Sequence, residues 1–194
     1  MGSILNEIYN YIIMIIESSS IYGPLFACFL IFIESILPVL PLFVFITIIF
    51  IAYGYGIGFI IAYLLTCLGC ICSFWLCRTF LKEFFEKKVR KIETFDKLMK
   101  RIDKMDLSTL VLLIAIPFTP AFLINIAASL SKMKFKKFLV AIMIGKLSLV
   151  FFWGFIGTSL IESLRNPKIL LIIGVMLLAM YLISKLVTKR LDIK

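Results

Sequence analysis

Long apolar stretches alternate with short basic segments along the chain. The apolar stretches cover residues 24–53, 59–81, 108–131, 138–161 and 169–184. A helix needs about 20 apolar residues to cross a bilayer, so stretches of this length predict membrane-embedded helices. They lack the two-residue alternation that is typical of a membrane barrel strand. The pattern therefore predicts an all-α polytopic membrane protein.

Two of the apolar stretches are interrupted by a pair of prolines. Pro38 and Pro41 interrupt the first stretch, and Pro117 and Pro120 interrupt the third. Because proline lacks a backbone N–H and breaks or kinks a helix, each pair predicts the tip of a broken helical hairpin. Such backbone is tolerated at membrane depth only where it is buried in protein or lines a wet cavity.

The spacing of later residues indicates that the two halves are an internal repeat. Phe59 and Phe138 follow the first proline of their pair at the same distance. Each phenylalanine opens a stretch of spanning length that contains a glycine, Gly69 in the first half and Gly145 in the second.

The basic residues predict how these segments cross the membrane. Lys104 precedes the second broken stretch and Lys132 follows it, so the positive-inside rule places both of its ends in the cytoplasm. That stretch is then a re-entrant hairpin, whereas the first begins and ends outside. The two hairpins form an inverted repeat, an architecture that many transporters use. Two pairs of proline-kinked spanning helices are the alternative.

The chain divides into three parts on this basis. The parts are an interfacial or partial-span helix at residues 1–20, a membrane domain at 21–161 and a C-terminal transmembrane helix with a basic tail at 162–194. The membrane domain consists of a first half at 24–81, a charged segment at 82–107 and a second half at 108–161. Apolar residues recur at helical spacing in the charged segment, which predicts an amphipathic helix on the cytoplasmic membrane surface. The glycine-rich segment 54–58 predicts a turn.

Composition and charge narrow the possible functions. The chain is 62% hydrophobic and 16% charged, with a net charge of +10 and no histidine. The basic residues flank apolar spans, so they indicate membrane topology and anionic lipid rather than nucleic acid. No nucleophile elbow, phosphate-binding loop or metal-ligand spacing is present, so we expect neither an enzyme nor a cofactor.

The five cysteines raise the possibility of a metal site. They are Cys28, Cys67, Cys70, Cys72 and Cys77. Four of them fall in one apolar, helix-length segment, where a four-cysteine site would require the chain to fold back. We interpret them as small packing residues in a helix interface.

Four polar residues within or beside the apolar stretches are candidates for function. Glu34 is the most informative, because a carboxylate at the bilayer centre costs about 2.5–3.5 kcal/mol and should face a cavity, pair with a cation or carry a proton. Lys146 could pair with Glu34 or bind a phosphate; the alternative is that it extends to the membrane surface. Arg78 could contact a phosphate or set topology, and Asn125 could satisfy backbone groups freed at the second tip.

These residues together resemble a known family. The residues that carry the resemblance are Glu34, Pro38, Pro41, Gly69, Phe74, Arg78, the segment 116–120, Asn125, the segment 127–129, Met133, Phe138 and Gly145. The pattern resembles the DedA / SNARE-associated (VTT-domain) membrane protein family. The resemblance implies two facing re-entrant hairpins and movement of undecaprenyl phosphate or phospholipid across the cytoplasmic membrane, coupled to protons. Glu34 matches the acidic position that the family requires.

The chain departs from the family pattern at several positions. Cys70 stands where a second acid is usual, and Cys77 replaces the glycine before Arg78. No arginine precedes Pro117, and Ser129 stands where glycine is usual. These departures leave proton coupling and an anionic substrate open.

We therefore expect a lipid flippase or scramblase of the cytoplasmic membrane, with lipid and protons as partners. A homodimer is compatible with the packing faces that short spans leave free. A small-solute or ion transporter is one alternative. A non-transporting scaffold or assembly factor, with 82–107 as its docking helix, is the other.

Overall fold

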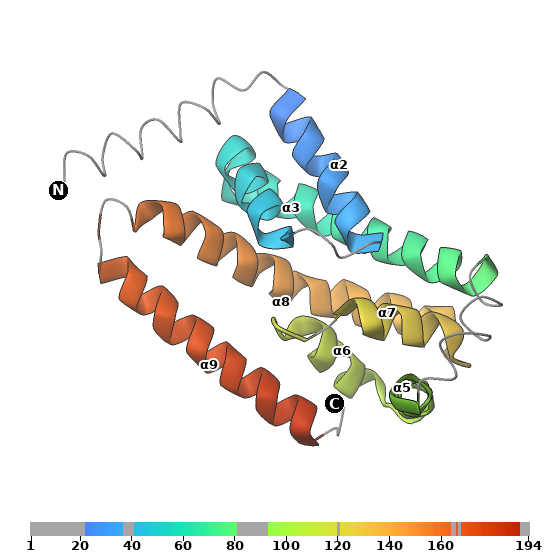
Figure 1. Ribbon diagram of the computed structural model, residues 1–194. Coiled ribbons are helices and arrows are strands. Elements are labelled where there is room, and N and C mark those ends of the chain that lie inside the picture. Colours follow the sequence, from blue (N-terminus) through green and yellow to red (C-terminus); the bar gives the residue numbers. More distant parts are fainter. Residues whose placement is uncertain are drawn as a thin grey trace.

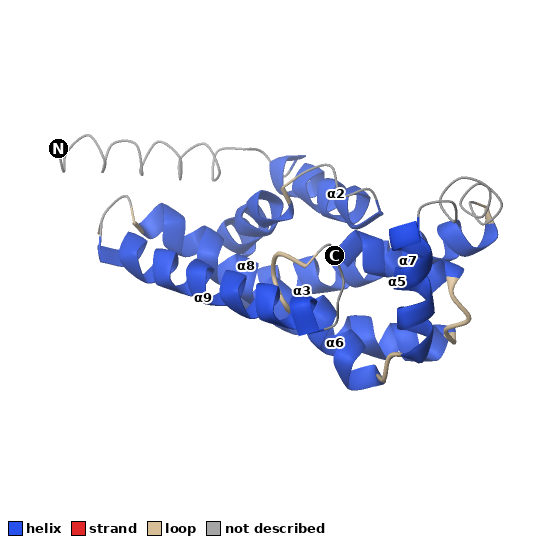
Figure 2. Ribbon diagram, turned by 60° about the horizontal axis from the view of Figure 1, so that its bottom comes forward, coloured by secondary structure: helices blue, strands red, loops and turns tan. Residues whose placement is uncertain are grey.

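The computed structural model is helical throughout the residues that it describes, which are 22–36, 41–80, 93–119, 121–163, 166 and 168–190. The helices are α2 (Tyr22–Ile36), α3 (Leu42–Thr79), α5 (Glu93–Lys104), α6 (Leu107–Ala115), α7 (Ala121–Leu130), α8 (Phe135–Glu162) and α9 (Lys168–Arg190). No strand occurs in this part of the chain, as Figure 2 shows. The helix expected at residues 1–20 lies outside the described residues.

Three helices are long and apolar enough to cross a membrane. They are Leu42–Thr79, Phe135–Glu162 and Lys168–Lys189. In Figure 1, α8 runs through the middle of the molecule, with α2 and α3 on one side and α9 on the other. The prediction of an all-α membrane protein is thus confirmed at this level.

The turn expected at the glycine-rich segment 54–58 is made at Gly54, where the chain folds back, because a Cβ built on Gly58 would lie 2.9 Å from the backbone oxygen of Ile49. Gly54 alone departs from helical geometry inside α3, with φ 74° and ψ 169°, and the helix resumes at Tyr55. Glycine has no Cβ and adopts positive φ at little cost, so a single residue is enough to redirect the helix. α3 therefore consists of a first arm, residues 42–53, and a second arm, residues 55–79.

Glycines of the two long helices α3 and α8 pack in a similar way. A Cβ built on Gly69 of α3 would lie 2.5 Å from the Cβ of Ser35 on α2. A Cβ built on Gly145 of α8 would lie 2.7 Å from Cγ2 of Ile114 on α6. Ser35 and Ile114 each stand three residues before the first proline of their pair. In both halves, then, the long helix presents a glycine to the same point of the preceding short helix.

Replacing Gly69 with leucine should destabilise the fold. The new side chain would meet Ser35 and also the carbonyl oxygen of Phe32, 2.8 Å from the Cβ position, and this backbone atom cannot rotate away. We expect a loss of about 1–3 kcal/mol, which is usual for overpacking. Thermal unfolding of the purified protein in detergent measures this loss. Gly174→Leu is the control, because nothing lies within 4 Å of its Cβ position, and equal effects would contradict the packing.

Two tyrosines of α3 hydrogen-bond to α8. Tyr55 Oη donates a hydrogen bond to Thr158 Oγ1 at 2.8 Å, and Tyr63 Oη donates to the backbone oxygen of Met143 at 2.9 Å. A hydroxyl that enters an apolar interface needs such a partner. The two contacts fix the second arm of α3 along α8.

The charged segment forms a helix whose apolar side contacts protein. The described part is α5, where Met99 and Ile102 are buried, and Met105 is buried just beyond its end. Residues 82–92 of the predicted amphipathic helix lie outside the described residues. The helix does not extend to 107 as predicted but ends at Lys104, because Asp106 caps the start of α6.

Asp106 holds this boundary through its side chain. Its Oδ2 accepts a hydrogen bond from the backbone N–H of Thr109 at 3.2 Å, and its Oδ1 accepts one from Thr109 Oγ1 at 2.5 Å. These bonds stabilise the carboxylate and lower the pKa of Asp106 below its usual value. An N-cap of this kind starts a new helix rather than continuing the old one.

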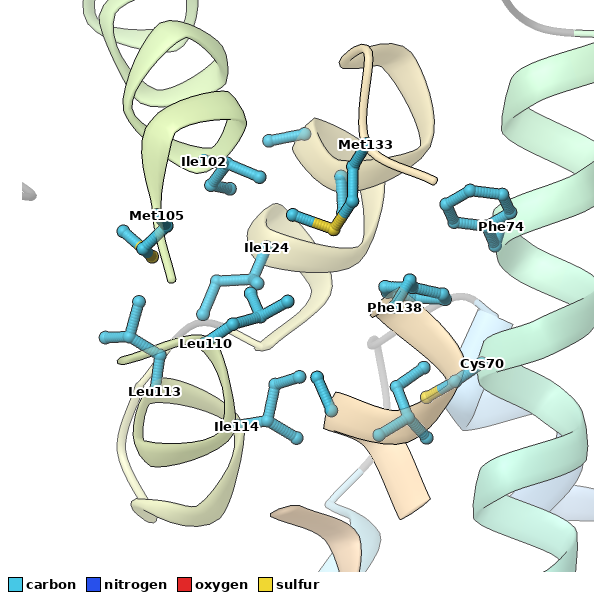
Figure 3. Close-up of a cluster of buried hydrophobic side chains, with 14 of the residues drawn as sticks. Cys70, Phe74, Ile102, Met105, Leu110, Leu113, Ile114, Ile124, Met133 and Phe138 are labelled. Atoms are coloured by element: carbon cyan, nitrogen blue, oxygen red, sulfur yellow. The ribbon is translucent and has the colours of Figure 1, made fainter. Parts of the chain in front are cut away.

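A buried cluster connects the second half to α3 (Figure 3). Phe74 of α3 and Phe138 of α8 are fully buried, and their rings stack with centroids 4.5 Å apart. Met133, from the loop before α8, points into the same cluster. This cluster and the glycine contacts fix the positions of the two broken segments, which meet at the cavity described next.

Candidate functional site

A cavity of about 300 Å³ lies where the two proline-broken segments meet. On the side of the first break, α2 and the start of α3 supply lining residues. On the side of the second break, the tip and α7 supply them. Residues of α8 line the remaining side. The lining residues are Glu34, Ser35, Pro41, Leu42, Phe43, Phe118, Thr119, Phe122, Asn125, Lys146, Leu149 and Trp153. The cavity therefore draws on both halves of the repeat.

One acid and one base face this cavity. Glu34 comes from α2 and Lys146 from α8, and they are the charged residues among the described lining. No hydrogen bond or ion pair joins either to another described residue, although Lys146 is near enough to attract the Glu34 carboxylate. Charges removed from bulk water are costly unless they find partners. Both groups are therefore available to a ligand that carries charge.

Lys146 is buried within the protein. It lies eleven residues after the start of α8, about 16 Å along the helix axis. Its side chain is 4% exposed and lines the cavity. This position is the one that pairing with Glu34 or binding of a phosphate in the cavity requires.

Thr119 adds a polar group that we did not predict. It sits at the tip of the second break, and its Oγ1 is buried without a hydrogen-bond partner among the described residues. A buried hydroxyl without a partner costs free energy, which a ligand could recover by bonding to it. Its place between Pro117 and Pro120 was the signal that could have identified it.

Phe118, beside Thr119, has an unusual backbone conformation. Its φ of 68° is positive, which is uncommon for a bulky residue and must be held by its surroundings. Its ring contacts Trp153 of α8, with centroids 5.7 Å apart, and Tyr181 of α9, with centroids 6.3 Å apart. The tip of the second break is thus held against two long helices.

Asn125 makes a different contact from the one that we expected. Its Nδ2 donates to Cys70 Sγ at 3.3 Å, so it joins α7 to α3 rather than satisfying backbone at the tip. Cys70, at the position of the family's second acid, is fully buried in this contact. Among the described residues, no group of three cysteine or acidic side chains is placed to hold a metal ion.

Arg78 lies away from the cavity lining. Its Nη1 donates to the backbone oxygen of Met133 at 3.0 Å, and its guanidinium lies 5.2 Å from the centroid of the Phe74 ring. The structure thus brings Glu34 and Lys146 together and gives Arg78 a contact between helices. Of the four prolines, Pro41 lines the cavity and Pro117 is buried, while Pro38 and Pro120 lie outside the described residues.

Replacing Arg78 with methionine should therefore lower stability more than it lowers activity. The Met133 carbonyl would lose its donor, at a cost of about 1–3 kcal/mol. The midpoint of thermal unfolding should fall, whereas the transport rate per folded molecule should stay near that of the wild-type protein. Arg78→Lys, which keeps a donor, is the comparison. An unchanged midpoint with lost activity would instead support a role in ligand binding.

The fold and cavity define a helical membrane protein with a charged cavity between its helices. A family model, the VTT domain, matches residues 37–159, which is more than half of the chain. The chain belongs to the VTT-domain (DedA) family, which is generally linked to membrane transport or lipid handling. The match begins just after Glu34.

A relative supports the same assignment along most of the chain. The Uncharacterized membrane protein YhjE of Bacillus subtilis (strain 168) is 29% identical over 178 residues, which cover 92% of this chain and 86% of that protein. No solved structure matches the chain.

Proposed function

We propose that this protein moves a lipid across the cytoplasmic membrane, as a flippase or scramblase for a phospholipid or for a polyprenyl phosphate such as undecaprenyl phosphate. The observation that carries the proposal is the pair Glu34 and Lys146 on one cavity between the two broken segments. A lipid headgroup carries a phosphate, which an ammonium binds well. The family is generally linked to membrane transport or lipid handling, which is compatible with a lipid substrate.

The lengths of the helices favour re-entrant hairpins over kinked spanning helices. α6 and α7 are 9 and 10 residues long. At 1.5 Å per residue each reaches about 15 Å, or roughly half the hydrocarbon thickness. A hairpin of two such helices enters the bilayer and returns to the same side. With the basic residues Lys104 and Lys132 at its ends, that side is the cytoplasm.

The two charges have separate roles in this mechanism. Lys146 attracts the lipid phosphate into the cavity while the hydrocarbon chain stays in the bilayer. Glu34 takes up or releases a proton, or binds a cation on the headgroup, so that the net charge in the cavity changes between the two sides of the membrane. In transporters built from inverted repeats, one central site is usually exposed alternately to the two sides of the membrane.

The alternative of a docking scaffold has less support. That role needs the apolar face of the charged segment to be free for a partner. Met99 and Ile102 of α5 are buried against the rest of the protein instead. A solute transporter with the same cavity is the remaining alternative, and its substrate would be water-soluble.

Translocation in sealed liposomes tests the proposal. Purified protein is reconstituted with labelled undecaprenyl phosphate and, in parallel, with a labelled phospholipid, with and without a pH gradient. Empty liposomes give the background. Faster movement of either lipid supports the proposal, and dependence of its rate on the gradient supports proton coupling. Flux of a charged solute with no lipid movement would favour the solute transporter.

A further inference from the structure

A second hollow, of about 220 Å³, lies between the first arm of α3 and the end of α8. Its walls are Phe43, Val44, Ile48 and Ile51 from α3 and Leu160 and Ile161 from α8. Both helices have the length and apolar character of membrane spans. The groove therefore lies on a part of the protein that faces hydrocarbon.

The floor of the groove has no free polar group that could hydrogen-bond to water. Gly157 lets the two helices touch, because a Cβ there would lie 1.6 Å from Thr47 Oγ1. Thr47 has the one polar side chain among the lining residues, and its Oγ1 donates to the backbone oxygen of Phe43 at 2.7 Å. A cavity without free polar groups does not hold ordered water, so an apolar occupant fits it better.

The groove adjoins the charged cavity at one residue. Phe43 lines both, and its ring centroid lies 5.8 Å from that of Trp153, which lines the cavity. At the other side Val44 is 36% exposed, so the groove is open along the surface of the protein. A molecule with a charged group near Lys146 and a flexible apolar chain could thus extend past Phe43 into the groove.

We propose that this groove holds a hydrocarbon chain of the same lipid whose headgroup enters the cavity. The inference rests on the proposed function, which supplies the headgroup. It adds that the protein binds part of the chain itself, rather than leaving the whole chain in bulk bilayer. The groove then contributes to affinity through contact with methylene groups, whichever headgroup is attached.

Photolabelling tests occupancy of the groove independently of transport. The purified protein in detergent is mixed with a phospholipid or a polyprenyl phosphate that carries a diazirine in its chain, and labelled residues are mapped by mass spectrometry. We expect labelling at Val44, Ile48 and Leu160 that saturates and is displaced by unlabelled lipid. Leu171 of α9, which is 72% exposed, gives the non-specific level. Labelling of the groove that equals this level and does not saturate would overturn the inference. The more strongly displaced probe identifies the acyl or prenyl chain.

A substitution that fills the groove with a larger side chain tests whether the groove is needed for transport. Val44→Trp should occupy the groove and weaken saturable labelling roughly tenfold, as expected when a few methylene groups lose contact. Translocation should fall with it. Val140→Trp, at a site of similar exposure on α8 but outside the groove, is the matched control.

The two proposals fail in different ways. If wild-type protein moves lipid and Val44→Trp moves it equally well with unchanged labelling, the groove inference is wrong and the proposed function stands. If wild-type protein moves no lipid, the proposed function is wrong, and non-saturable labelling would then overturn the groove inference as well.

Discussion

Replacing Glu34 with glutamine should reduce lipid translocation by up to roughly a hundredfold, because the transported headgroup or proton loses a charged partner, and a hydrogen bond to a charged group contributes about 1.5–3 kcal/mol. Glutamine keeps the size of the side chain and its place on the cavity wall. It removes the negative charge and the site for a proton. Translocation of labelled lipid in liposomes, normalised to folded protein, measures the effect.

The matched control for this change is Glu162→Gln. Glu162 is exposed at the end of α8 and lies outside the cavity lining. It should retain the wild-type rate. Equal rates for wild type and Glu34→Gln would remove Glu34 from the mechanism, and an equal loss in both variants would point to a general effect on the protein.

Replacing Lys146 with methionine should abolish movement of a lipid phosphate. Methionine has a similar length and no charge, so the cavity would keep its shape and lose its attraction for an anion. The change also leaves Glu34 without its nearby cation, which should lower the midpoint of thermal unfolding when Glu34 is ionised. Lys136→Met, on the exposed side of α8 near its start, is the control and should change neither quantity.

The double variant Glu34→Gln, Lys146→Met separates stability from transport. Removing both charges leaves no uncompensated charge in the cavity, so the double variant should unfold at a higher temperature than Lys146→Met alone. It should still be inactive. Additive losses of stability would mean that the two side chains do not interact.

Much of the architecture could be predicted because it follows from local patterns. Runs of apolar residues define the long helices, and prolines break them wherever they occur. The spacing after Pro38 and Pro117 predicts a repeat, and Gly69 and Gly145 each pack against a residue three positions before one of these prolines. The turn expected at 54–58 is made by Gly54 alone, since the chain is helical again from Tyr55.

The site was harder to predict because it depends on contacts between distant segments. Arg78 appeared suited to a phosphate, but its partner is the backbone of Met133, which no side-chain pattern reveals. Asn125 likewise contacts Cys70, which is 55 residues away along the chain. Glu34 and Lys146 were identified as candidates because charge is costly in a membrane. Their meeting on one cavity depends on how the helices pack.

The most direct test of the central claim is whether the charged cavity binds a lipid headgroup. Wild-type protein and the double variant Glu34→Gln, Lys146→Met are purified in detergent, and the lipid retained by each is measured by native mass spectrometry during stepwise delipidation. The account predicts that wild type retains a phosphate-bearing lipid after bulk lipid is removed and that the double variant, although folded, does not. Equal retention by both proteins, or none by either, would contradict it.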